Sequence, residues 1–102
     1  MAKEASRAGS LGDLAPYVLI AHDALKLVNA GDLGGAKARI KDLETAWDEA
    51  EEKMRPMSPE TWRTVDKAID RALAKLRAGK PDSAACKESL EALIAKCRQL
   101  DS

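Results

Sequence analysis

The chain has no phenylalanine, a single histidine, only two cysteines and no long hydrophobic run. Aromatic residues make up 3% of it, and this scarcity, with the abundance of alanine, favours close-packed helices over a β-sheet. The longest uninterrupted apolar stretch, Tyr17–Ala21, is far shorter than the roughly 20 residues of a membrane span or the apolar core of a signal peptide. We therefore expect a soluble chain without a membrane span or an export signal.

An excess of charge of one sign is also absent. Seventeen basic and seventeen acidic side chains cancel, so the chain has no overall electrostatic field that would attract nucleic acid or an anionic membrane. We expect no nucleic-acid partner.

Cysteine and histidine are too few for the usual metal and disulfide chemistry. Cys86 and Cys97 lie eleven positions apart on one expected helix, hence about 16 Å apart along its axis, too far for a disulfide. Together with the lone His22 they do not supply the four ligands of a zinc site. The glycine-rich turn at Gly31–Lys37 lacks the spacing of a phosphate-binding loop, although a helix N-terminus there could hold an anion. We expect no metal and no cofactor.

The positive signal is a set of four apolar stripes whose steps alternate between three and four residues. This spacing keeps each stripe on one face of a helix. It predicts an all-α fold, an antiparallel up-down-up-down four-helix bundle made of two helical hairpins, which occupies residues 13–102. Residues 1–12 are expected to be a flexible lead-in or an expression remnant. The stripes are Leu11, Leu14, Val18, Ala21, Leu25 and Val28; Leu33, Ala36, Ile40, Leu43, Trp47, Ala50 and Met54; Trp62, Val65, Ile69, Ala72 and Leu76; and Cys86, Leu90, Leu93, Cys97 and Leu100.

Capping and helix-breaking residues separate the stripes. Asp13 is expected to cap the first helix and Asp32 the second, while Ser58 followed by proline opens the third. The connections between the helices are short, which favours antiparallel neighbours. The expected breaks are at Gly31, Arg55-Pro56-Met57, Gly79 and Lys80-Pro81-Asp82-Ser83.

The first expected helix carries a second apolar line beside its stripe: Tyr17, Ile20, Ala24 and Leu27. Two lines on one helix indicate either a wide buried face or a patch that binds another helix. We predict that these four residues bind another helical protein or a second copy of the chain.

The turn between the second and third helices is flanked by Trp47 and Trp62. The simplest interpretation is that the two large side chains fill one end of the core, and that an indole N–H near the surface forms a hydrogen bond. The alternative is a weak site for a small ligand. An acidic block precedes this turn, and we expect its charges to pair with Arg63, Lys67 and Arg71, with Lys53 and with Arg55. The alternative is a basic partner or a cation site. The acidic block consists of Asp42, Glu44, Asp48, Glu49, Glu51 and Glu52.

The segment around His22, with Leu33-Gly34-Gly35-Ala36 and Leu43-Glu44, resembles the signature of histidine phosphotransfer domains, although Ala24, Leu25 and Lys26 stand where that family has leucine, lysine and glycine. These domains are four-helix bundles that offer a helical histidine to a response regulator. The resemblance implies that His22, expected at the edge of its helix and partly exposed, is a phosphoacceptor.

A second resemblance extends over residues 20–97. The pattern of Gly31-Asp32-Leu33, Trp47, Trp62, Val65-Asp66-Lys67-Ala68-Ile69-Asp70 and Leu76-Arg77 is similar to a group of short bacterial α-helical proteins of uncharacterised function, which often look exported. This resemblance implies a bacterial origin and leaves a periplasmic mature form and a cytoplasmic protein both open. It implies no activity.

The sequence thus predicts a binding or scaffold module that is not an enzyme and that associates with itself through the first helix. Two alternatives remain: histidine phosphotransfer through His22, and a carrier of a small ligand or cation at the Trp47/Trp62 end.

Overall fold

The computed structural model describes residues 13–100 and confirms the all-α fold. The expected lead-in 1–12, with Leu11, and the last two residues lie outside the described residues. The helices of the described part are α2 (Ala15–Asn29), α3 (Leu33–Met54), α4 (Pro59–Leu76) and α5 (Ser83–Leu100).

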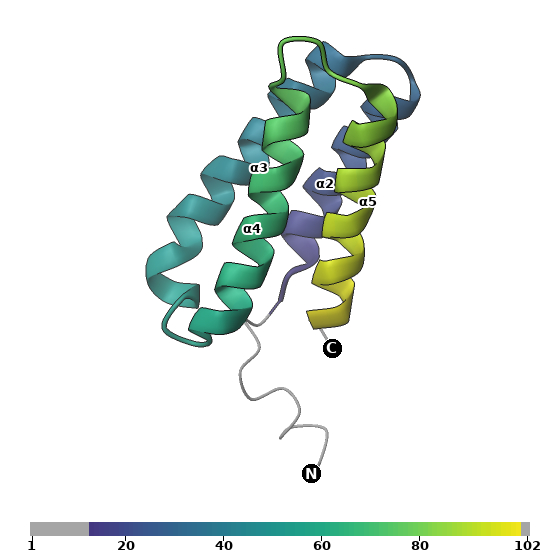
Figure 1. The fold of residues 1–102 in the computed structure, drawn as a ribbon. Coiled ribbons are helices and arrows are strands. Elements are labelled where there is room, and N and C mark those ends of the chain that lie inside the picture. The colour runs from purple at the N-terminus through teal and green to yellow at the C-terminus, as the bar shows by residue number, and fades with distance from the viewer. Residues whose placement is uncertain (1–12, 101–102) are drawn as a thin grey trace.

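The helices form a closed ring in the order of the chain. α2 and α4 each pack against both α3 and α5, so every helix touches two others. Successive helices run in opposite directions, and Figure 1 shows the α3–α4 connection at the opposite end of the molecule from the other two connections. The result is the expected antiparallel four-helix bundle, elongated at 46 × 23 × 17 Å.

Side chains cap the starts of three of the four described helices, at the predicted Asp32 and Ser58 and within the expected break at Asp82. Asp32 accepts a hydrogen bond from the backbone N–H of Gly35 at 2.8 Å, and Ser58 accepts one from Thr61 at 3.4 Å. Asp82 accepts one from the N–H of Ala85 at 3.3 Å. Since the Asp32 carboxylate occupies the N-terminus of α3, the anion site considered for the glycine-rich turn is filled by the chain itself.

The predicted cap of the first helix is wrong by one residue. The capping position of α2 is Leu14, whose side chain makes no capping hydrogen bond, while Asp13 accepts from the N–H of Ala15 at 2.9 Å. Leu14 is fully buried, and Pro16 in the first turn has no N–H that needs a cap. The start of α2 therefore combines the burial of Leu14, the proline of the first turn and the hydrogen bond that Asp13 accepts from outside the capping position.

The core follows the four stripes and adds residues that the stripes did not include. Leu73 of α4 and Ile94 of α5 are buried beside their stripes. Ser89 is buried as well, and its hydroxyl donates to the carbonyl of Cys86 at 2.9 Å, which satisfies the polar group. α4 and α5 bury wider faces than one stripe because each packs against two helices.

Within residues 13–100, none of the helices combines the length with the apolar character that crossing a bilayer requires.

Candidate functional site

The second apolar line of α2 faces into the bundle. Ala24 is fully buried, and Tyr17, Ile20 and Leu27 are half-buried and packed against the core. Both lines of α2 therefore belong to one wide buried face between α3 and α5. Leu19 is 65% exposed on the outer side, but a single exposed leucine is ordinary on a protein surface. Partner binding through this line stays a prediction.

His22 lies at the edge of α2 and contacts α5. It is half-buried, as its position beside the stripe predicted, and its Nε2 atom lies 3.0 Å from Nη2 of Arg98. A guanidinium can only donate, so Nε2 of a neutral His22 accepts and the ring proton sits on Nδ1. Lys26, one turn further along α2, is exposed. The surroundings of His22 are thus basic.

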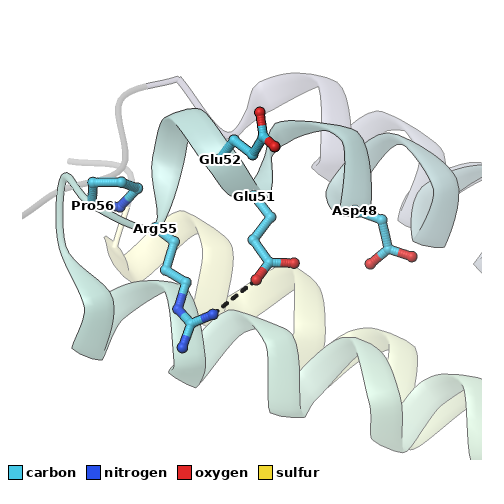
Figure 2. A pocket seen from close by; sticks show the side chains of 5 residues that line it. All are labelled: Asp48, Glu51, Glu52, Arg55 and Pro56. Atoms are coloured by element: carbon cyan, nitrogen blue, oxygen red, sulfur yellow. Dashed lines mark hydrogen bonds and ion pairs between the residues drawn. The ribbon is translucent and has the colours of Figure 1, made fainter.

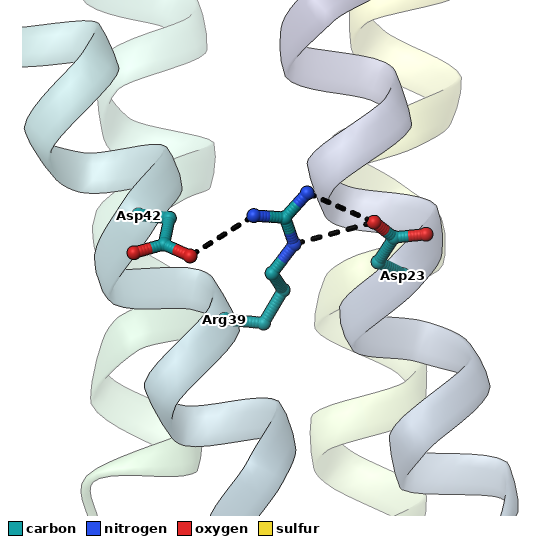
Figure 3. A network of polar contacts seen from close by, with 3 residues as sticks. All are labelled: Asp23, Arg39 and Asp42. Atoms are coloured by element: carbon teal, nitrogen blue, oxygen red, sulfur yellow. Dashed lines mark hydrogen bonds and ion pairs between the residues drawn. The ribbon is translucent and has the colours of Figure 1, made fainter.

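On the other side of α2, Arg39 of α3 bridges two carboxylates (Figure 3). Its Nη2 is 2.9 Å from Asp23 of α2, and its Nη1 is 2.9 Å from Asp42 of α3. The hydrogen bonds to Asp42 and to Asp23 raise the pKa of Arg39 above its ordinary value. Such exposed ion pairs are screened by solvent and contribute little to stability, and the contact with Asp23 links α2 to α3.

An aromatic cluster fills the end of the bundle at the α3–α4 connection. Trp47 and Trp62 stack with centroids 5.4 Å apart and planes inclined by 17°, and Tyr17 meets Trp47 edge-on at 5.3 Å. The Trp47 indole N–H donates to Asp66 at 3.0 Å, which confirms the expected partner for an indole, and the Tyr17 hydroxyl lies 3.5 Å from the sulfur of Met54. We call this part of the molecule the aromatic end.

The second indole of the aromatic end differs from the first. Trp62 is 9% exposed, and its N–H is buried without a hydrogen-bond partner, the one side-chain polar atom in that condition among the described residues. Its ring lies between Trp47 and Arg55, whose guanidinium carbon is 5.5 Å from the ring centroid. Arg55 is held by one ion pair, at 2.9 Å, to Glu51. An arginine therefore lies against an otherwise buried tryptophan.

A hollow of about 480 Å³ opens beside Arg55 at the C-terminal end of α3. Figure 2 shows the Arg55 guanidinium reaching toward Glu51 among the side chains that line it. Arg55 is the single cation against three carboxylates in this lining, so we call it the acidic hollow. Its lining residues are Asp48, Glu51, Glu52, Arg55 and Pro56.

Most of the expected pairing of the acidic block is not found. The structure contains the Glu51–Arg55 pair, but in the described part of the chain no ion pair involves Asp48, Glu49 or Glu52. The cations that we expected to neutralise them lie elsewhere.

Arg71 of α4 pairs with Glu88 of α5 at 2.8 Å instead of with α3. Arg77, the C-cap residue that follows α4, pairs with Glu44 of the acidic block at 2.8 Å. Arg63 and Lys67 are exposed and make no ion pair with any described residue. The physical reason is the ring arrangement, because a cation on α4 can turn toward α5 as easily as toward α3.

The carboxylate of Asp66 on α4 also lies near other negative charges. Burial is the main cause that raises its pKa, and the charges of Asp70 and Glu51 raise it further. The hydrogen bond from Trp47 acts in the opposite direction. The ionised carboxylate is therefore held at some cost beside the aromatic cluster.

Cysteines and metal ligands add no site. Cys86 and Cys97 are buried in the core, and burial raises the pKa of the Cys86 thiol, which makes it less reactive. Within residues 13–100, no group of three or more histidine, cysteine or acidic side chains is arranged to hold a metal ion.

Sequence reasoning missed three residues that the structure brings to the candidate sites: Arg55 on Trp62, Asp66 on Trp47, and Arg98 on His22. The Asp66 contact had a usable signal. Positions 47 and 66 are equally far from the centre of the turn between two antiparallel helices, so they lie side by side. Arg55 and Arg98 carried no such signal, since long side chains can reach several neighbours.

Comparison of this chain with protein-family models, with curated proteins and with solved structures found no match.

Proposed function

We propose that this chain is a non-catalytic helical-bundle binding module that receives a positively charged segment of another protein at the aromatic end. The supporting observation is the acidic hollow, where three carboxylates line a surface with one arginine. Charge of this sign is unfavourable near a helix C-terminus, because the helix dipole is negative there. Asp48 and Glu52 also stand four residues apart on α3, a spacing at which like charges destabilise a helix.

The fold therefore gains little from Asp48 and Glu52. In the described part of the chain, Asp48 and Glu52 have no pairing cation, and Glu51 is bound by Arg55 alone. A basic segment of a partner would supply the missing cations and would be attracted over a distance set by the salt concentration.

The test is the binding of a labelled oligoarginine peptide, measured by fluorescence anisotropy at low and at physiological salt. The double variant Asp48→Asn/Glu52→Gln removes two carboxylates from the acidic hollow and should weaken binding roughly tenfold, if each contact is worth somewhat under 1 kcal/mol. The matched control is Glu88→Gln/Glu91→Gln on α5, which changes the net charge equally at exposed positions.

The control should bind like the wild type. Equal weakening by both double variants would show that the peptide responds only to net charge, and the proposal would then be wrong. Absence of measurable binding to the wild type at low salt would also overturn it.

A second candidate function is histidine phosphotransfer through His22, favoured by the contact between its Nε2 and Arg98. The guanidinium of Arg98 would neutralise a phosphoryl group attached to Nε2, and the half-buried ring is still partly accessible. In this step Nε2 attacks the phosphorus of a donor such as acetyl phosphate, the P–O bond to acetate breaks, and acetate leaves.

This candidate predicts an acid-labile phosphate on the wild-type protein after incubation with acetyl phosphate. His22→Gln should abolish the label, and Arg98→Gln should slow its formation, whereas Arg71→Gln, a control on another helix, should not. A label that persists in His22→Gln, or no acid-labile label at all, would exclude phosphotransfer.

A further inference from the structure

We propose that Arg55 is an internal stand-in for an arginine of the partner, which displaces it from the face of Trp62 when the partner binds. The inference rests on the proposed function and adds the side chain that is recognised and the place where it is held. It starts from an arginine that the structure already shows in contact with this ring.

Trp62 offers a rigid ring to a cation. One face stacks on Trp47, which is itself fixed by its hydrogen bond to Asp66 and by the edge of Tyr17. The guanidinium of Arg55 lies over the ring. Tryptophan is the aromatic side chain that attracts cations most strongly, and a ring held in place loses no freedom when a cation binds.

The hold on Arg55 is weak enough for exchange. Its side chain is 54% exposed, and its one ion pair, to Glu51, is an exposed i,i+4 pair. Pairs of this kind are screened by solvent and stabilise a protein only slightly. Arg55 also stands at the C-terminal cap of α3, where its side chain can swing away without disturbing a helix interior.

The Trp62 N–H is a second unusual feature of this ring. It is buried without a partner among the described residues, although buried indole N–H groups usually find an acceptor. This unsatisfied donor distinguishes Trp62 from Trp47, whose N–H donates to Asp66, and it makes the Trp62 N–H a selective probe of changes at this ring.

The chemistry favours arginine over lysine. A guanidinium is planar, stacks on an aromatic face and can donate to a carboxylate at the same time, as Arg55 does with Trp62 and Glu51. A lysine ammonium is a compact and strongly hydrated charge that cannot stack. An oligoarginine peptide should therefore bind more tightly than an oligolysine peptide of the same charge.

The decisive variant is Arg55→Ala, compared with Arg63→Ala. Both remove one positive charge from an exposed side chain near the aromatic end, but only Arg55 lines the acidic hollow, pairs with Glu51 and covers the Trp62 ring. The indole resonance of Trp62 is therefore needed to assign a gain in affinity to the ring. Arg55→Ala should bind oligoarginine about two- to fivefold more tightly than Arg63→Ala does, as expected for one cation–π contact made available to the partner. The indole N–H resonance of Trp62 should shift on binding, and the shift should be larger than that of Trp47.

Equal affinities of Arg55→Ala and Arg63→Ala, or weaker binding by Arg55→Ala, would overturn the stand-in role. The proposed function would survive that outcome as long as Asp48→Asn/Glu52→Gln still weakens oligoarginine binding. Failure of the wild type and of both arginine variants to bind the peptide would overturn both proposals.

Discussion

The two ends of the bundle are built on different principles. The end with the α2–α3 and α4–α5 connections, which we call the glycine end, is closed by backbone geometry: Gly31 adopts a φ of 82°, and Asp32 caps α3. The aromatic end is closed by large side chains, Tyr17, Trp47 and Trp62. At the glycine end Asp32 and Asp82 accept hydrogen bonds from backbone N–H groups, whereas at the aromatic end the indole N–H of Trp62 is buried without a partner among the described residues.

This difference shows where the fold explains the sequence and where it does not. The caps and the turn glycine of the glycine end are fully accounted for by helix geometry. At the aromatic end, the α3–α4 turn is also capped, by Ser58, whereas Asp48 and Glu52 beside it form no ion pair with any described residue. Features that the fold does not need are the ones we assign to binding.

The largest effect on stability is expected from removing Trp47, which lies at the centre of the aromatic end. Trp47→Ala should lower the free energy of unfolding by about 3–5 kcal/mol, because the side chain is almost fully buried and leaves a large cavity. Val28→Ala, its counterpart near the glycine end, should cost only about 2 kcal/mol, since it removes two methyl groups. Urea denaturation measures both, and equal losses would show that the aromatic end is not the main stabilising part.

A medium effect is expected at the glycine end. Gly31→Ala should cost about 1–2 kcal/mol, because a side chain is strained at a φ of 82°. Gly79→Ala is the control: no positive φ is found there, and an added Cβ would meet no atom within 4 Å. Thermal and urea unfolding of the two variants should therefore differ, and a neutral Gly31→Ala would mean that the backbone conformation of this turn is not what closes the end.

The smallest effect concerns the charge on Asp66. The pKa of Asp66 in the folded state is raised above its ordinary value of 3.8. At pH values between 3.8 and the folded-state pKa, the folded protein therefore binds more protons than the unfolded chain. Stability therefore falls as the pH rises through this window and stays lower at neutral pH. Asp66→Asn should recover less than about 1 kcal/mol at neutral pH and nothing below pH 3.8.

The measurement is the free energy of unfolding in urea at a series of pH values. Glu91→Gln, which neutralises an exposed carboxylate of α5 with no ion pair to any described residue, should leave the pH profile unchanged. A wild-type stability that rises through the same window would show that the hydrogen bond from Trp47 outweighs burial.

Much of the fold was predictable because it depends on local rules. Helix periodicity identified the buried residues of each stripe, and Asp32 and Ser58 were recognised as caps from their place before a helix. Leu73 and Ile94 were missed because the stripe model assumes a narrow contact, whereas each helix here has two neighbours. Asp13 was misjudged because burial of the next residue, Leu14, moved the helix start.

The candidate site was less predictable because it depends on where long side chains turn. The sequence pointed to Trp47 and Trp62 and to the acidic block. It also predicted ion pairs between that block and cations of α4, and the structure does not contain these pairs among the described residues. The position of Arg71 on α4 allows it to reach α3 or α5, and only the three-dimensional arrangement decides for Glu88 of α5. The contact between Arg55 and Trp62 likewise depends on a rotamer rather than on spacing.

The pairing of α2 with α5 has a consequence for folding kinetics. These two helices are the most distant in sequence, yet they pack side by side, with the start of α2 and the end of α5 at the same end of the molecule (Figure 1). Docking them requires a long loop to close, which slows folding relative to the hairpins. A circular permutant that opens the chain at Gly79 and links α5 to α2 makes this contact local, but the α4–α5 contact then becomes the most distant one in sequence. It should therefore fold into the same bundle at a similar rate, with a different helix pair docking last.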